Sequence, residues 1–302
     1  MTICTFHEEK TATIVAGTLA DRARWIQKDH WVNTPASRAI IQWSEYMVRS
    51  GRVSRPICMQ IAGGPGTGKT ELLKVIEALH PIEKYTNPLR WVRPVLRIGP
   101  SLGDEGIYGL YKTILASAWP EARALDGRCS RIRCDDTLRS QHVRVLLIDE
   151  AIDLLACGPS NQKKLLAEFK RFGTDLSLNI VCASVEGLEH AIELDRQLKS
   201  RFVCTFRLSP WKETQEFRNF LHGFEMYLPF SRPSELDSQA MVKWLLSHSN
   251  GSMGEVTLLI KLAALFALDR RGDYVSIDDF ETAHNSELPP RCALALPIWD
   301  ED

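Results

Sequence analysis

The stretch from Gly63 to Thr70 constrains this chain more than any other. It reads Gly63-Gly64-Pro65-Gly66-Thr67-Gly68-Lys69-Thr70, a glycine, four residues, a second glycine, a lysine and a threonine. Such glycines let backbone N–H groups curl round phosphate oxygens, the lysine brings positive charge to the β- and γ-phosphates, and the threonine hydroxyl ligates Mg²⁺. The pattern therefore predicts a loop that binds a nucleoside triphosphate with magnesium.

The flanks of this loop argue against a chance match in an ordinary turn. An apolar run over 57–62 precedes it and predicts a strand. After it, apolar residues recur at helical spacing, namely Leu72, Leu73, Val75, Ile76 and Leu79. The helix would begin at the phosphates, with the positive end of its dipole facing them.

Further strands alternate with helices along the chain. Apolar runs predict strands over 92–98, 143–148, 178–183 and 202–208, and the segments between them favour helices, one of which should end at Phe172 because Gly173 follows. This alternation is typical of an α/β fold with a five-stranded, doubly wound parallel sheet sandwiched by helices. Beyond Pro210 the pattern is helical only, which predicts a small all-helical lid domain.

We expect four parts along the chain. They are a helical N-terminal lead-in (1–55), the nucleotide-binding α/β domain (56–210), the helical lid (211–287) and an irregular, proline-containing C-terminal tail (288–302). Ser276 with Asp279 resembles a capping box for the last lid helix. The arginine-rich stretch 121–144 is either plain solvated surface or a functional basic segment, and composition leaves both open.

Composition is that of an ordinary globular protein. The chain has 302 residues and a formal net charge of −1, so any DNA contact must come from a local basic patch. No apolar run approaches the ~18 residues that span a bilayer, and residues 1–10 lack the pattern of a secretory signal, so we expect no membrane partner and a cytoplasmic address. Zinc through Cys129 and Cys134, or through Cys4 and His7, would lack a second pair at ligand spacing.

Two acids end the predicted strand over 143–148. Because the carboxyl ends of parallel strands share one edge of the sheet, Asp149 and Glu150 should fall beside the phosphate loop. Asp149 would hold Mg²⁺ through its water shell, and Glu150 would orient and polarise the attacking water. Ser184, at the end of the next strand, is either a ligand of the γ-phosphate or the water, or an ordinary turn serine. We expect ATP, because the chain lacks the Asn/Thr-Lys-X-Asp signature that reads guanine.

Arg201 stands at the start of the last predicted strand, away from the phosphate loop of its own subunit. From there its guanidinium can complete only a neighbour's site, as an arginine finger on the transition-state charge. That role implies a ring or filament with ATP at the subunit joints. Arg196 is the second candidate for this finger, and a surface salt bridge is the alternative role of Arg201.

Several short motifs stand in an order that narrows the family. They are Asp21-Arg22, Trp25-Ile26, Asp29-His30-Trp31-Val32, Asp149-Glu150, Phe169-Lys170-Arg171-Phe172-Gly173, Asp195-Arg196-Gln197-Leu198, Pro210-Trp211 and Gly251-Ser252-Met253-Gly254-Glu255. Together with the phosphate loop they resemble the AAA+ ATPases and, more narrowly, the TniB family of transposition regulators, over about residues 20–290.

Similarity to TniB, and more distantly to TnsC and MuB, implies a bacterial ATPase that assembles on double-stranded DNA when ATP is bound. It would select the target site and recruit and activate a DDE-type transposase, with a TniQ-like protein as a further partner. DNA would be held through its phosphates. The candidate contacts follow the second predicted strand: Ser101, Lys112, Arg128, Arg131 and Arg133.

Two departures from the family pattern bear on mechanism. Many AAA+ proteins carry an arginine just after the lid turn, where this chain reads Met253-Gly254-Glu255, so we expect slow hydrolysis with ATP acting chiefly as an assembly switch. After the two acids, TniB relatives typically read Leu-His-Asn, whereas this chain has Ala151-Ile152-Asp153. The same loop would also serve a signalling or loader-type ATPase that recruits a protein effector without binding DNA.

Overall fold

The computed structural model describes residues 9–51, 53, 55–86, 89–99, 106–119, 131–152, 159–185, 187–193, 195–294 and 296. The chain forms two compact units. One is Pro35–Ser209, and the other is built from both ends of the chain, Met1–Thr34 with Pro210–Asp302. The lead-in expected over 1–55 is thus divided between the two units.

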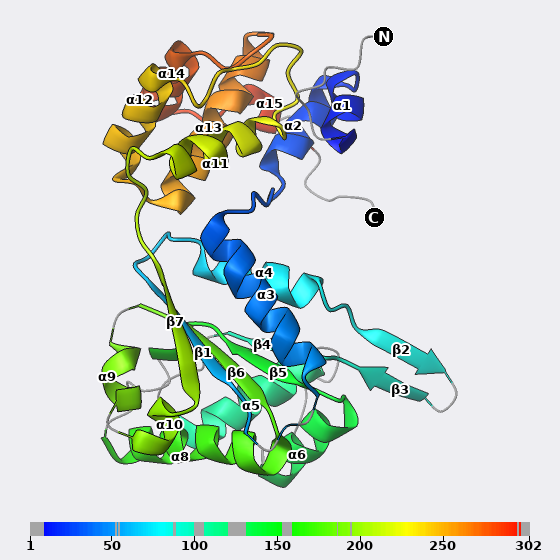
Figure 1. Cartoon of the computed structure of the whole chain (residues 1–302). Coiled ribbons are helices and arrows are strands. Elements are labelled where there is room, and N and C mark those ends of the chain that lie inside the picture. The colour runs from blue at the N-terminus through cyan, green and yellow to red at the C-terminus, as the bar shows by residue number, and fades with distance from the viewer. Residues whose placement is uncertain are drawn as a thin grey trace. The chain divides into compact units, whose positions relative to one another are not determined.

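A five-stranded parallel sheet organises the unit Pro35–Ser209 (Figure 1). Its order is β4 (Val95–Ile98), β5 (Val145–Ile148), β6 (Asn179–Ser184), β1 (Cys58–Gly63) and β7 (Phe202–Leu208). The central strands are buried throughout, as expected for apolar strands covered on both faces. The prediction of five parallel strands is confirmed.

Helices cover both faces of this sheet. Helices α3 (Pro35–Arg49) and α4 (Lys69–Ala78) contact one face, and α5 (Gly106–Ala118) and α8 (Pro159–Leu176) pack on the other (Figure 1). The hydrophobic core between the sheet and helices α5 and α8 also includes residues of α6 (Arg131–Ser140), α9 (Leu188–Glu193) and α10 (Arg196–Lys199). Alternate residues of β5 serve the two faces: Leu146 and Ile148 belong to the core under α8, whereas Val145 and Leu147 point the other way.

In three places the structure differs from the sequence analysis. The stretch over 121–144 is not all solvated surface, because α6 buries Cys134 and Leu138, one helical turn apart, in the core. An antiparallel hairpin of β2 (Glu83–Thr86) and β3 (Leu89–Val92) precedes the second sheet strand, which therefore starts at Val95. Helix α8 continues past Gly173 to Leu176.

The second unit is helical. Helices α1 (Glu9–Val15) and α2 (Leu19–Gln27) join α11 (Gln215–Glu225), α12 (Gln239–Ser249), α13 (Met253–Asp269), α14 (Ile277–Asn285) and α15 (Arg291–Leu294). Ala23 and Ile26 of α2 lie in the core of this unit, and the Trp25 indole Nε1 donates to the carbonyl of Tyr227 at 2.9 Å. Trp25 is therefore a packing residue here.

The tail from 288 is not wholly irregular. Helix α15 is fixed because the Asp269 carboxylate accepts hydrogen bonds from the backbone N–H groups of Arg291 and Cys292, at 2.7 and 2.8 Å. Asp269 lies 22 residues before Arg291, a separation that no local pattern signals.

Among the helices that the structure describes, none is individually long and apolar enough to cross a membrane. Helices α12 and α13 would satisfy length and composition only as a pair bent by 119°.

The capping box predicted at Ser276 and Asp279 is confirmed. The Asp279 carboxylate accepts hydrogen bonds from Ser276 N and Oγ at 2.7 Å each, and pairs with Arg270 Nε and Nη2 at 2.6 Å each. Burial disfavours the charged carboxylate, but the hydrogen bonds from Arg270 and Ser276 outweigh it and lower the pKa of Asp279.

Asp279→Asn should destabilise the helical unit by about 2 kcal/mol at pH 7, because it removes charge-assisted hydrogen bonds from a buried group. A carboxyl with a lowered folded-state pKa stabilises above its unfolded pKa of about 3.9, and that stability is lost as the pH falls through the folded-state value. Chemical denaturation at several pH values should therefore show the two proteins converging as the pH falls below the unfolded pKa of about 3.9. The exposed neighbour variant Asp278→Asn is the control, and an equal loss there would contradict the assignment.

Candidate nucleotide-binding site

The loop after β1 turns sharply into α4. Gly66 and Gly68 have φ values of 71° and 87°, a left-handed backbone that favours glycine. Gly68 occupies the N-cap of α4, and no side chain caps the first helical N–H groups. A helix N-terminus of this kind is suited to bind an anion.

Lys69 is held within the loop. Its side chain is buried, and Nζ donates to the carbonyls of Gly63 and Gly64 at 2.8 and 2.9 Å. Thr67 Oγ1 also donates to the carbonyl of Gly64, at 2.8 Å. The lysine charge therefore stands at the centre of the loop, at the start of α4.

The glycines of the loop face different surroundings. A Cβ on Gly63 would lie 2.7 Å from both the carbonyl oxygen of Leu208 and Thr67 Oγ1, so this glycine is required by packing. A Cβ on Gly64 would have no atom within 4 Å. Gly64 therefore borders open space, whereas Gly63 is enclosed, and the loop leaves room for a ligand beside Gly64.

The sheet register brings the other candidates to the same edge. Ser184 of β6 pairs with Ala62 of β1, directly before the loop. On its other side β6 pairs with β5, where Ile148 lies opposite Cys182, so Asp149 and Glu150 follow at the level of Ser184. The loop, the two acids and the serine therefore come from three adjacent strand ends, as predicted from the alternation of strands and helices.

The two acids differ in backbone and burial. Asp149 is 4% exposed, and its Oδ1 accepts a hydrogen bond from Glu150 N at 3.1 Å. Glu150 is partly exposed and has φ of 46°, an unusual conformation for a residue with a side chain. The buried acid thus ends the strand, and the partly exposed acid follows it in a left-handed turn.

The Ser184 side chain is fully buried, and its Oγ has no hydrogen-bond partner among the described residues. Leaving a buried hydroxyl unpaired costs about 1 to 3 kcal/mol. An ordinary turn serine would bond locally to its own backbone, which Ser184 does not do. Ser184 therefore does not behave as an ordinary turn serine, and its role as a ligand of the γ-phosphate or the water stays a prediction.

Arg201 lies at the other end of the sheet, directly before β7. Its Nη1 donates to the carbonyl of Lys170 at 3.1 Å and its Nη2 to Thr174 Oγ1 at 3.0 Å, both on α8. Both acceptors are uncharged, so the surface salt bridge considered for Arg201 is not formed with the described residues. The guanidinium therefore lies near the amino end of β7, opposite the edge that carries the loop.

The sequence model of one protein family, described as bacterial TniB protein, matches residues 22–213, more than half of the chain. The chain belongs to the TniB family.

Solved structures place this TniB-family chain in a wider fold class. ORC1 of Aeropyrum pernix, solved in complex with DNA, is 17% identical with a TM-score of 0.56, covering 87% of this chain and 68% of that one. ORC2 of the same organism, in an ADP form, is 15% identical with a TM-score of 0.58, covering 86% and 71%. The RuvB branch migration motor of Thermotoga maritima is 14% identical with a TM-score of 0.50, covering 86% and 72%.

At these identities the likeness establishes the fold, which is that of the AAA+ P-loop ATPases. The sheet order and the following helical unit agree with that class. Among curated proteins, no significant match to the sequence was found.

The candidate DNA contacts of the TniB-family chain are partly described. Arg131 and Arg133 are exposed in the first turn of α6, and Lys112 is exposed on α5, which packs against α6. Ser101 and Arg128 lie outside the described residues, as do Cys4, His7 and Cys129 of the zinc alternative. Cys134 lies in the core.

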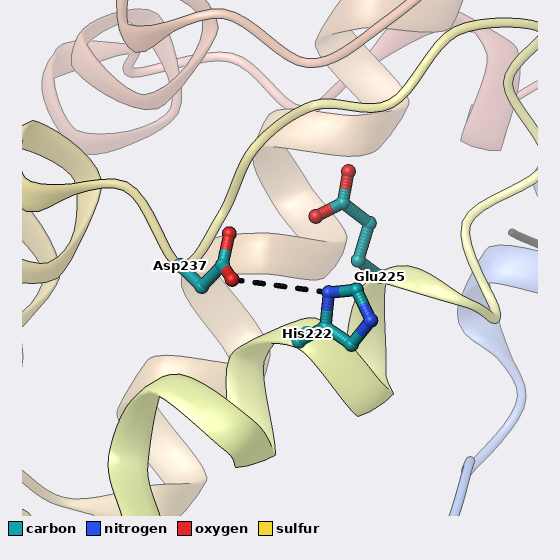
Figure 2. A group of neighbouring side chains, drawn as sticks. All are labelled: His222, Glu225 and Asp237. Atoms are coloured by element: carbon teal, nitrogen blue, oxygen red, sulfur yellow. Dashed lines mark ion pairs between the residues drawn. The ribbon is translucent and has the colours of Figure 1, made fainter. Parts of the chain in front are cut away.

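Three other side chains gather in the helical unit, as Figure 2 shows. One possible ligand atom from each of His222, Glu225 and Asp237 lies within 4.8 Å of the others, and His222 Nδ1 is 3.8 Å from Asp237 Oδ2. The Glu225 carboxylate already accepts hydrogen bonds from the backbone N–H groups of Ser234, Glu235 and Leu236. Its role is to anchor the loop that precedes α12.

Ser184→Ala should raise stability and lower turnover together. Removing a buried, unpaired hydroxyl should stabilise the fold by about 1 kcal/mol, while a hydroxyl that binds phosphate or water would be missed in catalysis. Thermal unfolding without nucleotide and steady-state phosphate release with Mg·ATP measure the two effects. Unchanged turnover with raised stability would leave Ser184 without a catalytic role.

Proposed function

We propose that this chain is an ATP-dependent, DNA-binding regulator of DNA transposition. It oligomerises on target DNA and recruits and activates a DDE-type transposase, with a TniQ-like protein as a further partner, in the bacterial cytoplasm. The observation that carries this proposal is membership of the TniB family in a chain whose phosphate loop and acids share one sheet edge.

ATP and Mg²⁺ are the proposed ligands of that edge. The loop from Gly63 to Thr70 would hold the phosphates through its N–H groups, with Lys69 on the β- and γ-phosphates. Thr70 Oγ1 and the Asp149 carboxylate would hold Mg²⁺, which neutralises charge on the phosphates. Glu150 would orient the attacking water and accept its proton, and Ser184 would donate to the γ-phosphate or bind the water.

The position of Arg201 supports assembly of the subunits into a polymer. Among the residues that the structure describes, its guanidinium donates only to uncharged acceptors, and it lies away from the loop of its own subunit, which supports a role on a neighbour's ATP. Helix α13 begins at Met253 with Gly254 and Glu255, so its first turn supplies no cation. Slow hydrolysis, with ATP as an assembly switch, agrees with that turn.

Duplex DNA is the proposed template for assembly, contacted through its phosphates by Lys112, Arg131 and Arg133. These three cations are exposed, and they stand on two helices that pack against each other, in a chain whose net charge is −1. The archaeal ORC1 structure, which includes DNA, supports this class of partner.

Negative-stain microscopy tests the assembly. With Mg·ATP or a non-hydrolysable analogue and duplex DNA, rings or filaments should form, and Lys69→Ala should abolish them because the phosphates lose their lysine. Omitting the duplex separates this proposal from a signalling or loader-type ATPase, which would assemble equally without DNA. A protein that stays monomeric with Mg·ATP and duplex would refute the proposal.

Charge reversal of Arg131 and Arg133 together should weaken DNA binding at all sequences alike. Each lost phosphate contact lowers the slope of log K against log salt by about 0.9, so the slope should fall by about 1 to 2. Fluorescence anisotropy with duplexes of different sequence, at several salt concentrations, measures both quantities. Lys243→Glu, on the exposed side of α12, is the matched control. An unchanged slope would remove α6 from the DNA contact.

A further inference from the structure

Gly173 lies within helix α8, where helix formation does not require a glycine. It lies three residues before the end of α8, and glycine is the poorest helix former after proline. No φ value in the left-handed range explains it, since Gly173 is absent from the residues with positive φ. The explanation lies in what packs on this turn.

The Arg201 guanidinium occupies the space that a side chain at residue 173 would fill. A Cβ on Gly173 would lie 2.1 Å from Arg201 Nη1 and 3.3 Å from its Cζ. The arginine backbone is fixed, because Arg201 N donates to the carbonyl of Leu198 at 2.8 Å and its own carbonyl accepts from Cys58 N at 2.8 Å. Because the backbone N–H and carbonyl of Arg201 are both hydrogen-bonded, a side chain at residue 173 must displace the guanidinium rather than the Arg201 backbone.

The residues around Gly173 complete this seat. Lys170 and Thr174 supply the two oxygens that accept from Arg201, one helical turn apart. Lys170 also pairs through Nζ with Asp195 Oδ2 at 2.7 Å, and Asp195 caps α10, the helix that leads into Arg201. Helix α8 therefore fixes both the approach of the chain and the guanidinium itself.

The seat orients Arg201 without neutralising it. Arg207, on the strand that follows Arg201, is paired with Glu189 at 2.7 Å, whereas Arg201 meets a carbonyl and a hydroxyl. A cation held by neutral acceptors remains available to a phosphate, and its preset direction removes the cost of ordering a long side chain.

We propose that Gly173 is a positioning residue for Arg201. Because residue 173 has no side chain, α8 can hold the guanidinium in the direction of the ATP of a neighbouring subunit. This inference rests on the proposed function, in which Arg201 acts in trans. It assigns the glycine of α8 to catalysis in the polymer rather than to the fold of the subunit.

The test compares Gly173→Ala, Arg201→Ala and the double variant in the full chain with Mg·ATP and duplex DNA. Misplacing a catalytic group by about 1 Å costs on the order of 10²-fold, so Gly173→Ala should lower kcat by 10-fold or more, about as Arg201→Ala does. Binding of a fluorescent ATP analogue to the single subunit should be unchanged in both. The double variant should be no slower than Arg201→Ala alone.

Mixing two variant proteins shows in which subunit of a joint Gly173 acts. Lys69→Ala subunits do not assemble alone, but they retain Arg201. At a joint where an Arg201→Ala subunit holds the ATP with its own Lys69, they should therefore restore turnover. Adding Gly173→Ala to the Lys69→Ala subunit should abolish that restoration. Adding it to the Arg201→Ala subunit should not, since that subunit has no guanidinium to position.

Thermal unfolding separates positioning from damage to the helix. In the Arg201→Ala background alanine at 173 meets no guanidinium and is the better helix former, so Tm should rise. Thr174→Val, which removes one acceptor without a clash, is a second variant and should lower kcat with Tm little changed.

The outcomes are distinct. If Arg201→Ala loses turnover and Gly173→Ala keeps it, the positioning role is overturned while the proposed function stands. If Arg201→Ala itself keeps turnover, the trans role falls and the positioning role with it. A fall in Tm for the Gly173→Ala, Arg201→Ala double variant would also overturn the proposal, because alanine would then damage the helix itself.

Discussion

The parallel register of β5, β6 and β1 is the constraint on which the site depends. One pairing sets Ala62 beside Ser184 and the next sets Ile148 beside Cys182, so the loop, the acids and the serine meet at one edge. A slip of one residue would turn each buried strand face over and would carry the acids out of line with the loop. The two apolar cores, which accept alternate residues of each strand, hold this register.

Burial of charge is the second condition of the site. Lys69 is 4% exposed and Asp149 is 4% exposed, and a buried charge is tolerated only where polar atoms surround it. The loop carbonyls provide them for the lysine, and a backbone N–H provides one for the aspartate. The same groups that make these charges tolerable fix their directions, so the site is organised by the fold itself.

Much of this arrangement could be predicted from sequence, because the central strands are continuous apolar runs and the loop motif fixes the start of α4. What escaped prediction depends on distant partners. Cys134 and Leu138 are too few apolar residues to reveal α6 among arginines, and α15 depends on Asp269. Gly173 predicted a helix end because glycine usually marks one, whereas here Arg201, 28 positions further along the printed sequence, occupies its open side.

The helical unit is assembled from the two ends of the chain, and this has a consequence for biosynthesis. The bond between Trp25 and Tyr227 spans 202 residues, so α2 leaves the ribosome long before the helices that bury Ala23 and Ile26 exist. Contacts of such long sequence separation form slowly, and unpartnered apolar helices invite aggregation meanwhile. Between the synthesis of α2 and that of α11 to α13, the nascent chain therefore exposes the apolar face of α2, and during this interval chaperones are most needed.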